Sequence, residues 1–269
     1  MGSDGQSDGR ALAIVTGASG GIGAATARRL AGRGYRVGLM GRNAAALDAL
    51  AEAIGRDRAV VACAELAEPE ACAAAVDALL TAHGPAAVLV NNAGAARYRP
   101  FLELDEDEHR RLVEVNYLGP ARLTRQVLPG MLERGAGHVI NVASMAARVG
   151  PWGHAGYAGA KAALVSLTQT LAAEYGGRGV HFCAVCPGIV DTPFFHGVEV
   201  EPLWRKMRRR AVSPERVARR IERLLDRPRA RVCVPASYRA LDWIDALSPG
   251  LAGRLVARQS RPGAAGRDG

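Results

Sequence analysis

The sequence predicts an α/β protein in which helices cover both faces of a mainly parallel, doubly wound sheet. Three observations support this class. Short apolar runs alternate with helical patterns along most of the chain, a glycine-rich turn follows the first run, and a small, amide-rich turn follows a later one. About seven such runs occur, so we expect a single domain of about seven strands over residues 11–235.

The expected strands are short and apolar. They cover residues 11–16, 35–40, 58–64, 86–90, 137–143, 180–185 and 231–234. Two long helices are expected among them, one over residues 105–132 and one over residues 156–174. The first opens with four acidic residues, which suit the positive end of a helix dipole. Ser213 and Pro214 are expected to begin a later helix as N-cap and first-turn residue.

Composition is that of an ordinary globular chain. Hydrophobic residues make up 49% of the 269 residues, yet no apolar run reaches the ~18–20 residues that a membrane helix needs. Residues 1–10 are rich in Gly, Ser and Asp, so we expect a flexible leader rather than a signal peptide. We therefore predict a cytoplasmic protein. Residues 261–269 are expected to form a disordered tail.

The five cysteines predict neither a disulfide framework nor a metal site. Their number is odd, and no secretion signal precedes them. Cys183 and Cys186 have a CxxC spacing, but they lie in an apolar run expected to be a strand. Residues three apart on a strand point to opposite faces. We therefore interpret the pair as small buried residues, with metal or redox chemistry as the alternative.

The net charge of +9 comes from the C-terminal quarter of the chain. Residues 201–269 contain 17 basic and 7 acidic residues, whereas residues 1–200 contain 18 and 19. Such a surplus can attract an anionic partner. An exposed helix surface in an arginine-rich chain explains it as well, and we favour that interpretation. We therefore expect no nucleic-acid partner.

A dinucleotide-binding turn is predicted after the first strand. The segment TGASGGIG contains Gly17, Ser19, Gly21, Ile22 and Gly23 and leads into a helix pattern. Glycines let the backbone approach a pyrophosphate, and a helix N-terminus favours its negative charge. A second small turn, NNAG, follows the strand at residues 86–90. Ligands bind near such strand ends in open parallel sheets.

The residue after the second strand distinguishes the two nicotinamide dinucleotides. An acid there bonds the ribose 2′-hydroxyl, whereas an arginine accommodates a 2′-phosphate. The chain has Arg42 at this place and no acid until Asp48. A guanidinium binds a phosphate well, and a carboxylate would repel it. We therefore predict that NADP(H) is preferred over NAD(H); the alternative is that Arg42 only flanks the strand.

Tyr157 and Lys161 are four residues apart in the second long helix, so they lie on the same face. A nearby ammonium lowers the pKa of a phenol, which is about 10 without neighbours, and improves it as a general acid or base. A surface tyrosine beside a solvated lysine has the same spacing. However, Lys161 is one of only two lysines among 35 basic residues. This rarity suggests a site that requires a compact ammonium.

Together, these motifs resemble those of the short-chain dehydrogenase/reductase family, which has a Rossmann-type fold. TGASGGIG, NNAG, Asn116 in VNYLG, Ser144 thirteen residues before Tyr157, YAGAK and PGIVDT follow the family's order and spacing. The resemblance implies that Tyr157 exchanges a proton with the substrate oxygen and that Ser144 orients the substrate carbonyl. Lys161 would lower the pKa of Tyr157 and hold the nicotinamide ribose. Asn116 would bind a water that links Lys161 to solvent.

The resemblance also extends the predicted cofactor site. It implies that Asn92 contacts the adenosine side and that Val190 and Thr192 hold the nicotinamide carboxamide. The remaining members of the predicted cofactor site are Ala93, Gly94, Pro187, Gly188, Glu65 and Leu66. Glu65 stands where the family usually has Asp near the adenine. Gly20 stands where many NADP enzymes of the family carry a base, so the NADP(H) prediction depends almost entirely on Arg42.

The predicted function is NADPH-dependent, reversible reduction of a small-molecule ketone or aldehyde to an alcohol. Two alternatives remain open: a non-redox reaction at the same site, such as epimerisation or dehydration, and an NADP-binding sensor without turnover. Residues 191–212 are long enough to form a lid. Residues 236–260 are expected to form a helical extension that covers the pocket, contacts a subunit or lies on a membrane surface. The family's usual dimer predicts a homodimer or homotetramer.

Overall fold

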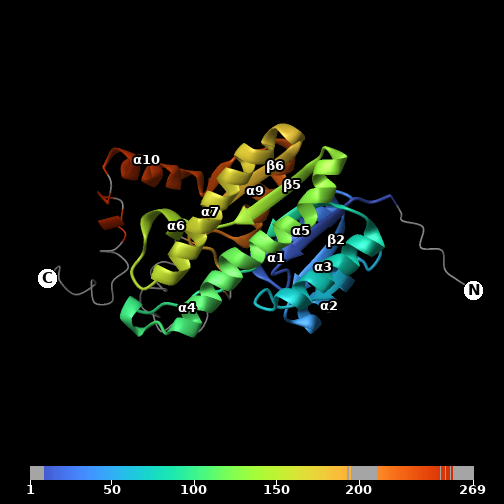
Figure 1. Ribbon diagram of the computed structural model, residues 1–269, viewed down its shortest axis with the longest axis horizontal. Helices are drawn as coiled ribbons and strands as arrows, with labels where there is room; N and C mark the ends of the chain where they lie inside the picture. Colours follow the sequence, from blue (N-terminus) through green and yellow to red (C-terminus); the bar gives the residue numbers. More distant parts are fainter. Residues whose placement is uncertain are drawn as a thin grey trace, which may run out of the picture.

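Figure 1 shows the computed structural model of the chain, which describes residues 9–192, 194, 211–248, 250, 251, 253, 254 and 256. Seven parallel strands form one sheet in the order β3-β2-β1-β4-β5-β6-β7. The strands are β1 (Leu12–Thr16), β2 (Arg36–Gly41), β3 (Ala59–Cys63), β4 (Ala86–Asn91), β5 (Gly137–Val142), β6 (Val180–Pro187) and β7 (Arg231–Val234). This order confirms the predicted doubly wound, Rossmann-type fold. Each strand lies within two residues of its predicted bounds.

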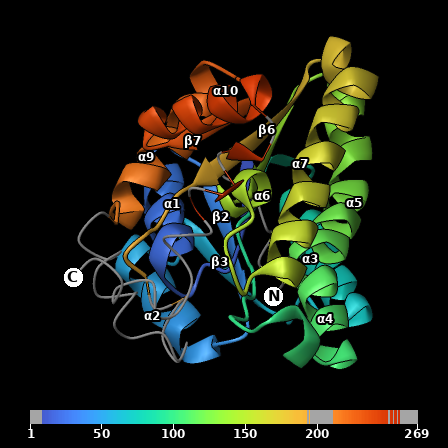
Figure 2. The same ribbon diagram turned by 90° about the vertical axis from the view of Figure 1, so that its left-hand side faces the viewer.

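Helices cover both faces of the sheet, as Figure 2 shows. One face carries α1 (Gly21–Gly32), α2 (Ala44–Ile54) and α9 (Pro214–Asp226). The other carries α3 (Pro69–His83), α5 (Gly119–Arg134) and α7 (Ala155–Tyr175). Shorter elements complete the described part: η1 (Phe101–Glu103), α4 (Glu106–Val113), η2 (Glu114–Leu118), α6 (Ala146–Val149), η3 (Gly176–Arg178), η5 (Ala236–Tyr238) and α10 (Arg239–Leu247).

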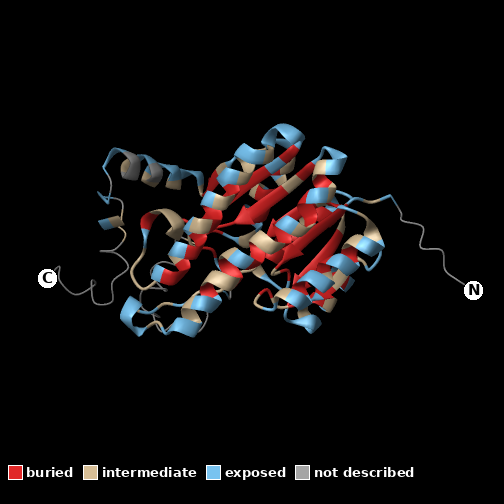
Figure 3. Cartoon of the chain, in the orientation of Figure 1, coloured by how far each residue is buried: buried red, intermediate tan, exposed pale blue. Residues whose placement is uncertain are grey.

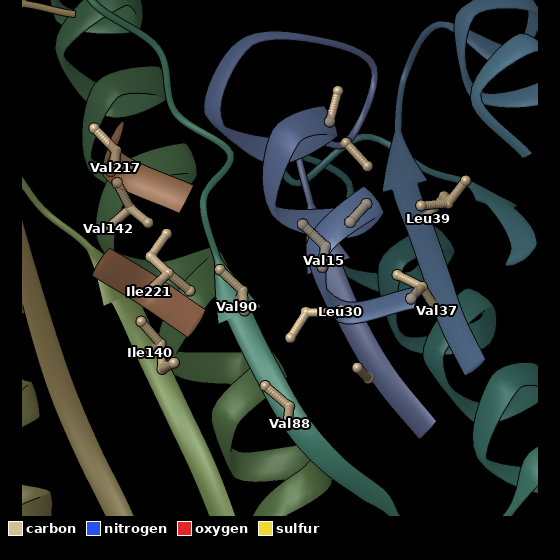
Figure 4. Close-up of a cluster of buried hydrophobic side chains, with 14 of the residues drawn as sticks. Val15, Leu30, Val37, Leu39, Val88, Val90, Ile140, Val142, Val217 and Ile221 are labelled. Atoms are coloured by element: carbon tan, nitrogen blue, oxygen red, sulfur yellow. The ribbon is translucent and has the colours of Figure 1, made fainter. Parts of the chain in front are cut away.

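Alternate residues of each strand supply the two core layers, because successive side chains of a strand point to opposite faces. Val15 and Val90 pack with Leu30 of α1 on one face (Figure 4). Ile14 and Leu89 belong to the cluster on the other face. Figure 3 shows how strongly burial is concentrated in the strands. The sheet is therefore buried on both sides, which is typical of parallel sheets.

The two cysteines of the CxxC spacing lie in β6 and are both buried. Cys183 packs with the α1, α2 and α9 layer, and Cys186 belongs to a separate cluster that includes Met145. Their side chains therefore point to opposite faces of the sheet, as the strand spacing predicts.

The segment expected as one helix over residues 105–132 changes its register in the middle. Asp105 caps α4 by accepting a hydrogen bond from the Glu108 amide at 2.7 Å. The chain then passes through the π-helical segment η2 before α5 begins. Pro120 favours this change, because it has no N–H to donate to the Asn116 carbonyl in an α-helical register. The predicted long helix is therefore present, but it contains a π-helical turn that the sequence analysis did not predict. A π segment often marks a functional site.

A buried polar network fixes α7 against the sheet. Asn91 of β4 donates to the side-chain oxygen of Asn141 at 2.8 Å. Asn141 of β5 donates to the Thr168 hydroxyl at 2.8 Å, and that hydroxyl donates to the Leu164 carbonyl at 2.7 Å. Hydrogen bonds of this kind offset the cost of burying polar groups. The network therefore holds the helix that carries Tyr157 in a defined position.

Several predicted segments fall partly or wholly outside the described residues. These are most of the leader at 1–10, most of the lid at 191–212 and the tail at 261–269. Within the expected extension at 236–260, the structure describes η5, α10 and isolated residues beyond them. No helix in the described part of the chain is both long and apolar enough to cross a membrane.

Candidate active site

A cavity of about 640 Å³ lies at the carboxyl ends of the strands, where ligands bind in open parallel sheets. It is lined by most of the predicted site residues: Gly17, Ser19, Gly21, Ile22, Arg42, Glu65, Leu66, Asn92, Ala93, Gly94, Ser144, Tyr157, Lys161, Pro187, Gly188, Val190 and Thr192. Gly23 and Asn116 do not line it, but each contacts a residue that does: Gly23 packs against Gly17, and Asn116 hydrogen-bonds to Ala95. The structure therefore brings residues from every sequence motif to one place.

The glycine turn forms one end of this cavity. Gly17 and Gly21 have φ angles of 64° and 53°, in the left-handed region that favours glycine. A Cβ atom on Gly23 would overlap the Gly17 carbonyl oxygen, so a glycine lets α1 pack closely against the end of β1. No side chain caps the N-terminus of α1, which leaves its first N–H groups available to a phosphate. These features fit a dinucleotide pyrophosphate.

Asn92 ties the NNAG turn to the glycine turn. Its side-chain nitrogen donates to the carbonyl oxygens of Thr16 at 3.0 Å and Gly17 at 3.3 Å. The Thr16 hydroxyl in turn accepts from the amides of Asn92 at 3.0 Å and Ala93 at 2.9 Å. The side-chain nitrogen of Asn92 therefore already donates to two main-chain carbonyls. The adenosine contact implied for Asn92 stays a prediction. Asn92 shapes the cavity wall.

Ser144, Tyr157 and Lys161 converge at another part of the cavity. The Ser144 hydroxyl hydrogen-bonds to Tyr157 and accepts from the Ala146 amide at 3.0 Å. The Lys161 ammonium donates to the Val142 carbonyl at 2.9 Å and lies 6.0 Å from the centre of the Tyr157 ring. β5 therefore supplies the carbonyl, the loop after β5 supplies the serine, and one face of α7 supplies the phenol and the ammonium.

Burial controls the ionisation of both groups on α7. Tyr157 is 6% exposed and Lys161 is 3% exposed. Burial raises the pKa of Tyr157 to about 12, although its hydrogen bond with Ser144 acts in the opposite direction. Burial also lowers the pKa of Lys161 to about 8. The pKa of Tyr157 is therefore raised in the protein chain alone and not lowered as predicted, because desolvation is the largest effect on the phenol.

Asn116 is fully buried in the π-helical segment. Its side-chain nitrogen donates to the carbonyls of Leu112 and Ala95, both at 2.8 Å, and its oxygen accepts from the Ala95 amide at 3.3 Å. A Cβ atom on Gly94 would lie 3.0 Å from Asn116 Oδ1 and 3.6 Å from Lys161 Nζ. Asn116 therefore holds the loop after β4 close to Lys161. Its link to a water stays a prediction.

Three charged residues meet at the end of the cavity that follows β2 and β3. Arg42 Nη1 lies 3.4 Å from Glu65 Oε1, and Arg111 Nη2 lies 2.5 Å from the same oxygen. All three residues line the cavity. The sequence analysis missed Arg111, which comes from the acidic helix α4. No sequence motif signals this residue, because its contact with Glu65 joins positions 46 residues apart.

Aromatic side chains surround Tyr157. The ring of Phe194 lies 6.2 Å from that of Tyr157, and the His154 ring lies 6.0 Å from it. Tyr98 packs against His154 at 5.2 Å and Trp152 at 5.3 Å between ring centres. These contacts suit an apolar substrate wall. Because most of residues 191–212 lie outside the described part, lid closure stays a prediction.

The C-terminal extension packs against the loop after β6 through Tyr238. The sequence analysis did not predict this contact. The Gly188 amide donates to the Val234 carbonyl at 2.9 Å, and the Pro187 carbonyl accepts from the Met145 amide at 2.9 Å. The Tyr238 ring packs so closely on Gly188 that a Cβ atom there would overlap it. Tyr238 therefore braces the loop that is predicted to hold the nicotinamide.

We expect Gly188→Ala to lower the free energy of unfolding by about 1–3 kcal/mol, because the added methyl group displaces the Tyr238 ring. Gly159→Ala is the control, because a Cβ atom there meets nothing within 4 Å. In a helix interior, alanine is favoured over glycine by about 1 kcal/mol. Urea denaturation measures both variants, and equal stabilities would contradict the close packing of Tyr238 on Gly188.

Comparisons with known proteins agree with this site. The sequence model for the short chain dehydrogenase family matches residues 11–201. The chain belongs to this family of oxidoreductases, whose members bind nicotinamide cofactors. D-threitol dehydrogenase of Mycolicibacterium smegmatis is 38% identical over 188 residues, which cover 69% of this chain and 72% of that protein.

Two solved structures illustrate the similarity of fold. A variant of actinorhodin polyketide ketoreductase with NADPH has a TM-score of 0.77 and 31% identity, covering 84% of this chain and 97% of that one. The 3-ketoacyl-(acyl-carrier-protein) reductase from Brucella melitensis complexed with NADH has a TM-score of 0.76 and 28% identity, covering 83% and 96%. These two relatives were solved with different nicotinamide cofactors.

Proposed function

We propose that the protein is an NADPH-dependent reductase of small-molecule ketones or aldehydes that also runs in reverse as an alcohol dehydrogenase. The observation that carries this proposal is a single cavity that joins Ser144, Tyr157 and Lys161 to an uncapped helix N-terminus behind a glycine turn. The relatives named as dehydrogenases and ketoreductases support the same reaction class.

The residues of the cavity suit a nicotinamide dinucleotide, which supplies the hydride when it is bound. The glycine turn and the start of α1 would hold its pyrophosphate, and Arg42 would hold a 2′-phosphate. Lys161 would contact the nicotinamide ribose, and Val190 and Thr192 would contact the carboxamide. A Cβ atom on Gly21 would lie 2.9 Å from Thr192 Cγ2, so Thr192 stands close to the glycine turn.

The protein's own chemistry is orientation of the substrate and transfer of a proton. The Ser144 hydroxyl, held by the Ala146 amide and Tyr157, would orient the substrate carbonyl. Because burial raises the pKa of Tyr157 to about 12, the phenol keeps its proton at neutral pH and is ready to act as a general acid. Lys161, with a pKa of about 8, is mainly charged at neutral pH and would stabilise the resulting phenolate.

The direct test is NADPH oxidation by the purified protein with a panel of ketones and aldehydes. We expect loss of NADPH absorbance in equal proportion to the alcohol formed. Conversion of a substrate without net loss of NADPH would indicate an epimerase or dehydratase instead. Binding of NADPH without conversion of any compound in a broad panel would favour the sensor hypothesis.

We expect Arg42→Asp to weaken NADPH binding by about 10- to 100-fold and to shift preference toward NADH. The variant removes a charge-assisted contact with the 2′-phosphate and replaces it with repulsion. Fluorescence titration with each cofactor gives the two Kd values. Arg56→Asp is the control, because Arg56 pairs with Glu52 and Asp48 outside the cavity. Unchanged NADPH affinity in Arg42→Asp would contradict the proposed preference.

We also propose that the protein works as a homodimer or homotetramer through the helices α5 and α7. The cytoplasmic location and a membrane contact of the C-terminal extension stay predictions. Sedimentation of the purified protein measures the oligomeric state directly.

A further inference from the structure

We propose that Arg111 sets the cofactor preference by competing with Arg42 for the Glu65 carboxylate, an inference that rests on the proposed NADPH dependence. Arg111 belongs to α4 and lines the cavity. Arg111 and Glu65 are 46 residues apart in the sequence. Only the tertiary fold brings the three charges together.

The parallel sheet places a carboxylate beside the predicted phosphate-binding arginine. β2 and β3 are paired with Gly41 opposite Cys63, and the Ala64 amide donates to the Gly41 carbonyl at 3.0 Å. Arg42 and Glu65 follow these positions directly, so the fold makes them neighbours. A carboxylate at this place attracts the Arg42 guanidinium and repels an approaching phosphate.

The distances show which arginine the carboxylate prefers. Glu65 Oε1 lies 2.5 Å from Arg111 Nη2 but 3.4 Å from Arg42 Nη1. Charge-assisted contacts between nitrogen and oxygen are normally about 2.7–2.9 Å long, so the Arg42 contact is loose. The Arg42 side chain is 67% exposed, whereas that of Glu65 is 24% exposed. Arg42 therefore shares Glu65 with Arg111 through a longer contact, and its guanidinium stays largely exposed to a ligand.

The sum of charges leads to the same result. With Arg111 present, the three side chains carry a net charge of +1 and one loosely held guanidinium. Without Arg111 the remaining two side chains are neutral together, and Glu65 pairs with Arg42 alone. Arg111 is thus a positioning residue that acts through Glu65 and needs no contact with the phosphate. Its effect should appear in binding of a 2′-phosphate and not in binding of the rest of the nucleotide.

The test measures binding of 2′,5′-ADP and 5′-AMP to the full-length protein by calorimetry. The readout is the ratio of the two Kd values, because a general loss of structure weakens both probes together. We expect Arg111→Gln to lower this discrimination by about tenfold and Glu65→Gln to raise it several-fold. In the Glu65→Gln background, Arg111→Gln should have much less effect, because the carboxylate that Arg111 restrains is gone.

Arg110→Gln is the matched control. It removes the same charge from the adjacent position of α4, but Arg110 pairs with Glu106 at 2.6 Å and does not line the cavity. Its discrimination ratio should stay within about twofold of the unchanged protein. An equal fall in the Arg110 and Arg111 variants would mean that only the general charge of α4 matters, and the inference would be overturned.

Two further outcomes overturn the inference. One is an unchanged ratio of the two Kd values in Arg111→Gln. The other is an equal fall of this ratio when Arg111→Gln is made with and without the Glu65 carboxylate, which would mean that Arg111 contacts the phosphate directly. Arg42→Ala separates this inference from the proposed function. If Arg42→Ala removes discrimination and Arg111→Gln does not, only the role of Arg111 fails. If Arg42→Ala changes nothing, the NADPH preference itself fails.

Discussion

Tyr157→Phe is expected to lower kcat/KM for NADPH-dependent carbonyl reduction by at least about 10²–10⁴-fold. The substitution removes only the hydroxyl that would donate the proton. The ring is expected to keep its place between His154 and Phe194, at 6.0 Å and 6.2 Å between centres. NADPH affinity and the unfolding midpoint should therefore change little. Steady-state kinetics with any ketone that passes the panel test, together with a cofactor titration, measure both quantities.

Tyr175→Phe is the matched control for this substitution. Tyr175 is the last residue of the same helix, and its ring packs against Phe182 at 6.4 Å without lining the cavity. We expect its kinetics to stay within about twofold. If Tyr157→Phe also keeps full activity, the proton comes from another group and the proposed mechanism is wrong. If a biological effect of the protein survives in an inactive Tyr157→Phe variant, the sensor hypothesis gains support.

Lys161→Met is expected to lower the rate at neutral pH by about 10²–10³-fold and to remove a pH dependence centred near 8. Burial lowers the pKa of Lys161 to about 8, so its positive charge disappears as the pH rises through this value. The charge is needed to stabilise the phenolate that proton donation leaves. In the unchanged protein kcat/KM for reduction should therefore fall above about pH 8. Tyr157, with a pKa of about 12, does not titrate in this range.

The measurement is a pH profile of kcat/KM between about pH 6 and 10, which reports the ionising groups of the free enzyme. A profile that is flat across pH 8, or an inflection that persists in Lys161→Met, would contradict this assignment.

The ionisation of Lys161 also makes the free energy of unfolding depend on pH. Between the folded pKa of about 8 and the ordinary lysine pKa of 10.5, the unfolded chain holds the proton more strongly, so this group's contribution to stability rises with pH. Met removes this dependence but leaves the Val142 carbonyl without its 2.9 Å donor.

The fold and the main site residues could be predicted because they depend on short-range features. Apolar runs, a helix cap such as Ser213 and a glycine-rich turn act over a few consecutive residues. Strand ends in a parallel sheet must meet at one edge. The pairing of Ser144 with Tyr157 in one site came instead from the resemblance to the short-chain dehydrogenase/reductase family, which the order and spacing of the motifs carry.

What the sequence by itself determined is the arrangement of elements and the chemical types of residue at the cavity, because periodicity and motif spacing are properties of neighbouring residues. The tertiary structure decided the rest. The π segment at Asn116, the brace of Tyr238 on Gly188 and the sharing of Glu65 depend on contacts between residues far apart in the chain. The ionisation of Tyr157 and Lys161 depends on burial. Neither a long-range contact nor the loss of solvent around a side chain is encoded in local spacing.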